Sequence, residues 1–292
     1  MTRPTADICV AGLVYFEVYV PALAPIPSGT ESFVHEIPVA IGGAVNTASV
    51  ANALGAEVVL AYPRGDGLSD LAIDAALGSM KLETRPWVGP DNPAVSLVYT
   101  SATDRSFVSA AAFSSLAACP ALPAARWLHA PGIREAQALT SRLEEGRANG
   151  ARISVSASWV PDLLEALRTP KHAPWDLLVI NEAEARCVAP DLDEALTVLS
   201  HAAHRVVITR GPRGSLAQFE RTRVVSPAAE PEGTHTTGAG DAFTAGLLVA
   251  LCENAGPREA LEFAHRVAAR KMRSRGGCAD NAAQFADLRG RA

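Results

Sequence analysis

An aspartate follows three small residues near the C-terminus and is itself followed by an apolar helix pattern. The small residues are Gly238–Gly240, the aspartate is Asp241, and the helix pattern runs from Ala242 to Cys252. Glycines let a ligand approach the backbone, and the first amides of a helix are unpaired and lie at its positive end. Such a segment binds anions, so a carboxylate inside it calls for a functional explanation. Asp241 would take the proton of an attacking hydroxyl while the amides hold a phosphoryl group.

Two other interpretations of this segment remain open. Asp241 could be an ordinary cap of the helix that follows. The glycines could also start a dinucleotide-binding loop, but Phe243 stands at the third glycine position and the segment lies far from the first strand. A GxxxxGK[ST] loop is absent from the sequence, which excludes a P-loop nucleotide site.

Size and composition are those of a globular enzyme. The 292 residues suit one large α/β domain, and hydrophobic residues make up 48% and charged residues 20%. The net charge of −5 argues against a nucleic-acid-binding protein. Five dispersed cysteines without metal-ligand spacing are typical of a reducing compartment. Because no stretch has the pattern of a signal peptide or membrane span, we expect a cytoplasmic protein without membrane contact.

Apolar, β-rich stretches alternate with helical patterns along most of the chain. This alternation predicts βαβ units and a mostly parallel sheet with helices on both faces. The predicted strands are Ile8–Val14, Val58–Ala61, Trp127–Ala130, Ile153–Ser156, Leu177–Ile180 and Val206–Thr209. The predicted helices are Val45–Leu54, Ser69–Leu77, Arg134–Ala148, Pro161–Leu167 and Leu192–Ala202.

Two regions interrupt the alternation. Residues 21–38 are rich in Pro, Gly and Ser, and Val95–Tyr99 and Arg105–Ser109 have the pattern of a β-hairpin. Strands outside the βαβ rhythm are expected to form a small β-sheet lid over the crevice at the strand C-termini, where ligands bind in open α/β folds. We therefore expect a single domain over 1–292 with lid segments near 15–41 and 93–110.

The C-terminal segment resembles a signature of the ribokinase (PfkB) family of carbohydrate kinases. Further matches to this family are found in the expected order: Gly42-Gly43-Ala44-Val45-Asn46, Leu54-Gly55-Ala56, Gly65-Asp66-Gly67, Asn181-Glu182-Ala183-Glu184, and Thr209-Arg210-Gly211 with Gly214. The resemblance spans nearly the whole chain. It implies a ribokinase-like three-layer α/β/α sandwich and an ATP-dependent kinase acting on a hydroxyl of a small sugar or sugar-like polyol.

The resemblance also assigns roles to individual residues. Asp241 would be the catalytic base, and the amides of Gly238, Ala239 and Gly240 would hold the transferring phosphoryl group. The acceptor would be held by Gly42, Gly43 and Asn46, and ATP by Thr209, Gly211 and Gly214, with His265 near the adenine. Asn181 and Glu184 would help to place Mg²⁺ and the phosphates, with Glu184 reaching the metal through water. Lid strands in this family often pair between subunits, which favours a homodimer.

Three positions depart from the family pattern. Glu17 stands where an aspartate commonly grips the acceptor, so the pocket is expected to favour a different acceptor. His235 replaces an aspartate that in many members supports a monovalent cation, so potassium activation is not expected here. The asparagine of the Gly-Gly segment, Asn46, comes one residue earlier than in ribokinase, which argues against a strict ribose assignment.

Several simpler interpretations stay open. Asn181 and Glu184 could simply start a helix, and Gly211 and Gly214 could turn a hairpin. The basic residues near the C-terminus are interpreted mainly as a solvated helix face; they are Arg258, Arg266, Arg270, Lys271, Arg273 and Arg275.

The function also has alternatives. One is a nucleoside kinase of the same fold, with a base slot formed by Tyr15, Phe16, Tyr19 and Phe33. Another is a non-catalytic sugar- or nucleotide-binding protein.

Overall fold

A large sheet runs through the molecule, which is described by a computed structural model over residues 4–21, 28–100, 105–279 and 281–288. Its strand order is β13-β12-β11-β10-β9-β8-β1-β4-β5. Neighbours from β11 to β5 run parallel, whereas β12 and β13 join antiparallel at one edge. The strands are β1 (Ala6–Ala11), β4 (Val58–Arg64), β5 (Glu83–Val88), β8 (Ala125–Ala130), β9 (Arg152–Ser156), β10 (Leu177–Asn181), β11 (Arg205–Thr209), β12 (Ser215–Phe219) and β13 (Thr222–Ser226).

Helices cover both faces of this sheet. Alternate residues of β1 enter opposite cores: Ile8 and Val10 pack on one face, and Cys9 and Ala11 on the other. The first face is covered by α1 (Ala44–Ala53), α2 (Leu68–Gly78), α8 (Ala239–Cys252) and α9 (Pro257–Lys271). The second is covered by α3 (Ile133–Ala138), α4 (Thr140–Ala148), α5 (Pro161–Ala166), α6 (Glu182–Val188) and α7 (Leu192–Leu199). Short 3₁₀ helices are η1 (Phe113–Ala118), η2 (Gly211–Arg213) and η3 (Ala282–Leu288).

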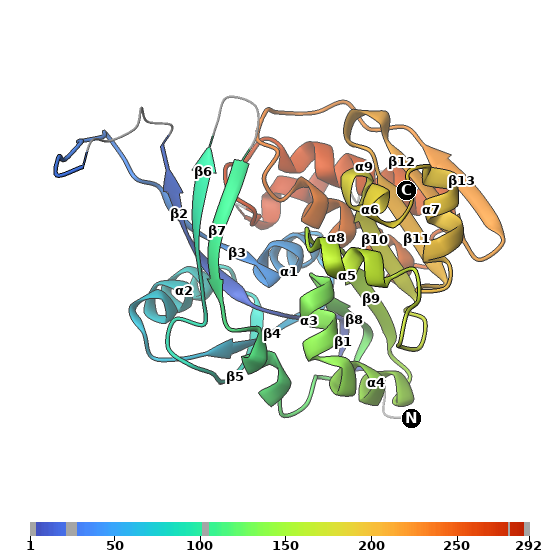
Figure 1. The fold of residues 1–292 in the computed structure, drawn as a ribbon, viewed down its shortest axis with the longest axis horizontal. Coiled ribbons are helices and arrows are strands. Elements are labelled where there is room, and N and C mark those ends of the chain that lie inside the picture. The colour runs from blue at the N-terminus through green and yellow to red at the C-terminus, as the bar shows by residue number, and fades with distance from the viewer. Residues whose placement is uncertain (1–3, 22–27, 101–104, 280, 289–292) are drawn as a thin grey trace.

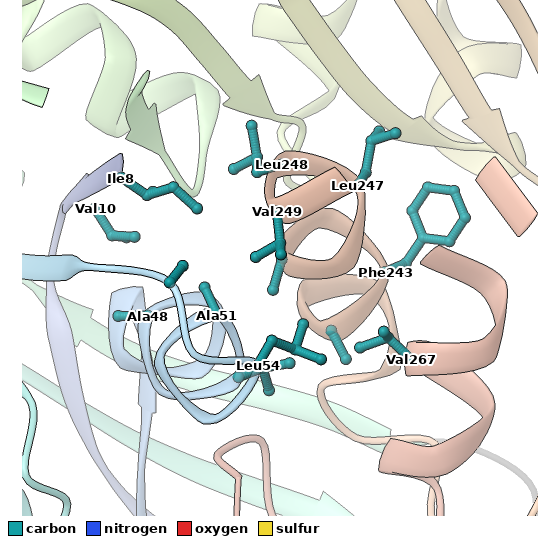
Figure 2. Packing of buried hydrophobic residues seen from close by; sticks show 14 of the residues in the cluster. Ile8, Val10, Ala48, Ala51, Leu54, Phe243, Leu247, Leu248, Val249 and Val267 are labelled. Atoms are coloured by element: carbon teal, nitrogen blue, oxygen red, sulfur yellow. The ribbon is translucent and has the colours of Figure 1, made fainter. Parts of the chain in front are cut away.

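Helix α8 lies in the centre of the first core. Every residue from Ala242 to Cys252 is buried, as expected for a helix that is apolar on all sides. Figure 2 shows Leu248 and Val249 of α8 beside Ile8 of β1, with Ala51 of α1 across from them. This burial fixes the position of the first turn of α8 relative to α1.

A second, smaller sheet has the strand order β3-β2-β6-β7. Its strands β2 (Val14–Val20), β3 (Val39–Gly43), β6 (Ala94–Thr100) and β7 (Arg105–Ala111) come from the two regions that interrupt the βαβ alternation. The pairs β2–β3 and β6–β7 are antiparallel, and β2–β6 is parallel. In Figure 1 this sheet stands at the opposite end of the molecule from β12 and β13. Residues 22–27 and 101–104 of the expected lid segments lie outside the described residues.

The expected fold class is confirmed, with local differences. The predicted strand Ile8–Val14 is the end of β1 and the start of β2, separated at Gly12 and Leu13, because both strands and the buried Leu13 are apolar. The predicted helix 134–148 is divided into α3 and α4, where the Thr140 hydroxyl donates to the Gln137 carbonyl and competes with the helical pattern. Strand β5 was not predicted, because most of its residues are exposed and it contains Pro86.

Candidate active site

The first turn of α8 is positioned by a glycine that no other residue could replace without strain. Gly238 caps the helix with φ +71°, in the left-handed region. A Cβ at this position would lie 2.5 Å from the carbonyl oxygen of Gly277, so the backbones of the two segments are in close contact. The sequence around Gly238 therefore builds a tight turn that ends at Asp241, the third residue of α8.

Asp241 meets Asn46, which lies at the same position of a second helix. The N-terminal cap of α1 is Gly43, with φ +75°, and Asn46 is the third residue of that helix. The Nδ2 of Asn46 donates to Oδ2 of Asp241 at 2.9 Å. The positive ends of two helices therefore meet around one carboxylate, 195 residues apart in sequence.

The surroundings of Asp241 adjust its acidity. Burial raises the pKa of the carboxyl from 3.8 to about 6, opposed by the Asn46 hydrogen bond and the positive charge of Lys271. As a residue Asp241 is half-buried. A carboxylate with this pKa is ionised at neutral pH and is a stronger base than an exposed aspartate.

Most of the backbone amides around Asp241 are available to a ligand. Among the described residues, the amides of Gly238, Gly240 and Asp241 donate to no protein acceptor. The Ala239 amide differs from the expectation, because it donates to the Thr236 carbonyl at 3.2 Å. An anion here would therefore be held first by the other three amides.

A pocket of about 450 Å³ lies on one side of the start of α8. Four of the residues assigned to ATP binding line it together with Ala239 and Gly240: Thr209, Gly211, Gly214 and His265. His265 is buried, its Nε2 lies 2.9 Å from the Ser215 hydroxyl, and its ring meets Phe243 edge-on. Burial lowers the pKa of His265 to about 4, so the imidazole is neutral at physiological pH. The pocket is lined mostly by apolar atoms, which suits a planar base.

Asn181 and Glu184 form the reciprocal cap of α6. The amide of Glu184 donates to Oδ1 of Asn181 at 2.8 Å, and the amide of Asn181 donates to Oε2 of Glu184 at 3.0 Å. These two residues therefore do start a helix. Asn181 also pairs with Thr209 across β10 and β11, which places this cap beside the pocket of about 450 Å³. Burial raises the pKa of Glu184, opposed by its bonds to Asn181.

A second pocket, of about 570 Å³, opens on the other side of the segment that leads into α8. Its lining includes Tyr19 of β2, Ala40 of β3, and His235, Thr237 and Arg275. His235 and Thr237 face this pocket, whereas Thr236, Ala239 and Gly240 face the first one. Residues 235–240 therefore form a partition between the two pockets.

Glu17 lies in the second sheet next to this pocket. Its side chain is buried, its Oε2 accepts from the Tyr19 hydroxyl at 2.9 Å, and a Cβ at Gly42 would lie 2.1 Å from its Oε1. A glycine at position 42 therefore makes room for the longer acid at position 17. The structure brings Glu17, Gly42 and Asn46 to the side of the site that faces the second sheet.

Lys271, at the end of α9, was missed in the sequence. It is fully buried and Arg270 is nearly so, which shows that the expectation of a solvated basic face was wrong for these two residues. A signal was present: Ala260, Ala264, Val267 and Lys271 follow one another at helical spacing, so Lys271 falls on the buried stripe of α9.

The aromatic slot considered for a nucleoside base is not assembled as a unit. Phe33 is 88% exposed, and of the four aromatic residues only Tyr19 lines either pocket beside the start of α8. Tyr15 and Phe16 pack instead against the two hydrophobic cores.

Two absences concern the described part of the chain alone. No helix there is both long and apolar enough to cross a membrane. Within the same residues, His, Cys, Asp and Glu side chains do not gather in threes as a metal site would require.

Comparisons with known proteins identify the family and the fold. A family model described as pfkB family carbohydrate kinase matches residues 5–284. A fructokinase of Salmonella thompson is 30% identical over 156 residues, which are 48% of this chain and 70% of that protein. The fold is shared with a ribokinase of Arabidopsis thaliana solved with ribose and ATP, with TM-score 0.76 and 17% identity over 97% of this chain and 98% of that one. An adenosine kinase of Sinorhizobium meliloti has TM-score 0.76 and 18% identity, covering 98% of this chain and 99% of that one.

Proposed function

Because the chain belongs to the pfkB family of carbohydrate kinases, we propose that it transfers the γ-phosphoryl group of ATP to a hydroxyl of a small sugar or sugar-like polyol. The observation that supports this most is the position of Asp241. The carboxylate accepts a hydrogen bond from Asn46 and lies in the first helical turn, where several amides have no protein acceptor. Asp241 directly follows residues 235–240, which line the two pockets on opposite sides.

ATP would lie in the pocket of about 450 Å³, with its base toward His265 and Phe243. Its phosphates would then reach the start of α8, where the amides of Gly238, Gly240 and Asp241 stabilise negative charge. The acceptor would lie in the pocket beneath the second sheet, with Glu17 and Asn46 binding its hydroxyls and Gly42 and Gly43 allowing close approach.

Asp241 is the general base of the transfer. Its carboxylate accepts the proton of the acceptor hydroxyl while that oxygen bonds to the γ-phosphorus and the bond to the ADP oxygen breaks in line. With a pKa of about 6, Asp241 is ionised at neutral pH and ready to take this proton. The second sheet acts as a lid that keeps water from the γ-phosphoryl group.

Magnesium would arrive with the nucleotide. The described residues hold no cluster of three acidic or imidazole side chains, whereas Mg²⁺ commonly binds through one carboxylate, several waters and the phosphates. Glu184 fits that role, because one of its oxygens caps Asn181 and it sits next to the nucleotide pocket. The ion supplies charge neutralisation between the phosphates when bound.

The acceptor is more consistent with a sugar than with a nucleoside. The lining of the second pocket is mainly polar or small, with charged and hydroxyl groups from Tyr19, Glu36, Thr237 and Arg275, and its aromatic rings are those of Tyr19 and His235. Glu17 and Asn46 offer acceptors and donors suited to hydroxyls.

We also propose that two chains associate through the second sheet. Four aliphatic side chains lie in register across it, in the order Val39, Val18, Leu97 and Val108. Val39 and Val108 are each 60% exposed and Leu97 is 36% exposed. We call these four residues the aliphatic row. An exposed aliphatic row of this kind is typical of a contact between proteins.

A substrate panel tests the reaction. ATP with magnesium is combined with sugars, polyols and nucleosides in turn, and both ADP and the phosphorylated product are measured. We expect a sugar or polyol to yield product in equal amount to ADP. Tight binding of ATP and an acceptor with no product would instead favour a non-catalytic binding protein, and product from nucleosides alone would favour the nucleoside kinase.

Asp241→Asn tests the base. We expect turnover to fall by roughly 10²- to 10⁴-fold while ATP binding, measured by calorimetry, is retained. Asp193→Asn is the matched control, because it removes the same charge from the first turn of α7, where Asp193 is exposed and paired with Arg223. Near-normal turnover in Asp241→Asn would exclude Asp241 as the base.

A further inference from the structure

Residues 272–278 form the wedge between the starts of α1 and α8, and we call them the wedge segment. The carbonyl of Met272 accepts from the His235 amide at 3.1 Å, just before α8. A Cβ at Gly277 would lie 2.2 Å from Oδ1 of Asn46, and the thiol of Cys278 donates to the same oxygen at 3.5 Å. The wedge segment therefore touches both the residue that holds Asp241 and the turn that begins α8.

Lys271 anchors the wedge segment from beneath. The residue has no exposed surface, although a lysine is almost never fully buried unless its charge is compensated. Its Nζ donates to the carbonyl of Gly276 at 2.8 Å, so the side chain spans the segment that follows it. The ammonium is thus hydrogen-bonded to the backbone that abuts Asn46 and Gly238.

The charge of Lys271 also reaches Asp241. It lowers the pKa of that carboxyl, against the larger effect of burial. Removing the charge would leave the Asn46 hydrogen bond as the remaining contact that favours the carboxylate.

We propose that Lys271 is a positioning residue of the phosphoryl-transfer site. Its ammonium is a built-in cation that holds the wedge segment against the starts of α1 and α8 and keeps the Asp241 carboxylate charged. The inference rests on the proposed role of Asp241 as the base.

Other charged and titratable groups face this region from several elements. Glu17 lies on β2, and Cys278 feels the charges of Glu17, Lys271 and Asp241. Burial raises the pKa of Cys278 to about 12, so the thiol is neutral. Helix α1 contributes the uncharged Asn46. His235 and Arg275 line the neighbouring pocket from the segment before α8 and from the wedge segment. Among the described groups, Lys271 is the buried cation whose charge acts on Asp241.

A titration of Asp241 tests the proposal without needing turnover. The side-chain carboxyl signal, labelled with ¹³C and assigned with Asp241→Asn, is followed by NMR against pH in the wild type and in Lys271→Met. We expect the midpoint to rise by about one pH unit or more when the charge is removed, as for a lost opposite charge nearby. Lys271→Gln, which keeps a donor for Gly276, should show the same rise.

Arg270→Met is the control. Arg270 precedes Lys271 and is also buried, but it pairs with Glu232 and Asp287 instead of the wedge segment. We expect this variant to lose thermal stability and to leave the Asp241 midpoint unchanged. An unchanged midpoint in Lys271→Met or Lys271→Gln would overturn the proposal, whether or not the protein phosphorylates a sugar.

Two further measurements complete the test. If both Lys271 variants fail to fold, NMR of the lysine side chains in the wild type decides, because a neutral Lys271 at pH 7.5 would also overturn the proposal. Once an acceptor is found, the acidic limb of kcat/KM should move with the NMR midpoint. If the NMR midpoint of Asp241 shifts but the acidic limb of kcat/KM does not, Asp241 is not the base, and the role of Lys271 stands.

Discussion

Asp241 sits in its position at an electrostatic disadvantage that an ordinary helix cap would not have. Its pKa in the folded protein is raised by burial from 3.8 to about 6. The folded state therefore binds this proton more tightly than the unfolded chain does. The contribution of this group to stability consequently falls as pH rises from about 4 to 6, and the full penalty is present above 6. Strain of this kind is common where a residue is kept for chemistry.

We therefore predict that Asp241→Asn is more thermostable than the wild type at pH 8. The gain should be roughly 1–2 kcal/mol, after allowance for the half-buried position of the residue, and smaller at pH 5. The introduced carboxamide oxygen can still accept from Asn46, so the packing of α1 against α8 is kept. Thermal unfolding by circular dichroism at both pH values measures the difference. The stability of the variant is compared with that of the wild type at each pH. If this difference is less favourable to the variant at pH 8 than at pH 5, Asp241 is a simple helix cap.

For single residues, the sequence predicts a role where neighbouring residue types form a distinctive chemical pattern. The small residues before Asp241 predict an anion site from their types alone. The partnership of Asp241 with Asn46 could not be derived from spacing, because it depends on how α1 and α8 pack. Lys271 was misread, since a charged residue is normally exposed and its burial depends on the wedge segment that follows it.

Among the elements, α6 combines two tasks in its first turn. Asn181 and Glu184 cap each other, and this cap stands at the end of β10 next to the pocket of about 450 Å³. Capping alone does not require a negative charge at position 184, because glutamine serves equally well there. A glutamate that is buried despite the rise in its pKa therefore suggests a further use of the charge.

We predict that Glu184→Gln folds with a Tm close to that of the wild type and uses MgATP less well. The fall in kcat/KM for MgATP should be roughly 10- to 100-fold and should be partly restored by excess magnesium. Glu194→Gln is the control, because Glu194 occupies the equivalent position of α7 and is exposed. Unchanged kinetics in Glu184→Gln would leave Glu184 with the capping role alone.

The elements themselves were mostly predictable, because βαβ rhythm produces strong patterns. Strands β8 to β11 are buried apolar runs, and all were predicted within two residues of their ends. Errors arise where the sequence pattern does not reflect the packing. One is the exposed edge strand β5. Another is the boundary between β1 and β2, where two strands of different sheets follow each other without a polar residue between them.

For the whole molecule, the second sheet is the part whose surface suggests contact with another chain. Its outer face presents the aliphatic row of Val39, Val18, Leu97 and Val108, with Tyr99 beside it at 43% exposure. The sequence predicted strands in this region, but the in-register row follows from the parallel pairing of β2 with β6, which joins segments far apart in the chain.

We predict a particle of twice the 30.5 kDa chain mass in light scattering after size exclusion. The double variant Leu97→Lys with Val108→Lys should be monomeric, because two charges would be buried in the contact. Leu68→Lys is the control, since Leu68 is 85% exposed on α2 and lies outside the row. A monomeric wild type, or a double variant that still dimerises, would contradict the proposed association.

The partition formed by residues 235–240 allows its two sides to change independently during evolution. One side of it is lined by the turns and helices after β11, and the other by strands of the smaller sheet. With the acceptor and ATP bound as proposed, substitutions on the smaller sheet would change the acceptor pocket and leave the nucleotide contacts intact. The contact between Glu17 and Gly42 shows how tightly such changes are constrained, because a Cβ at position 42 would lie 2.1 Å from Oε1 of Glu17.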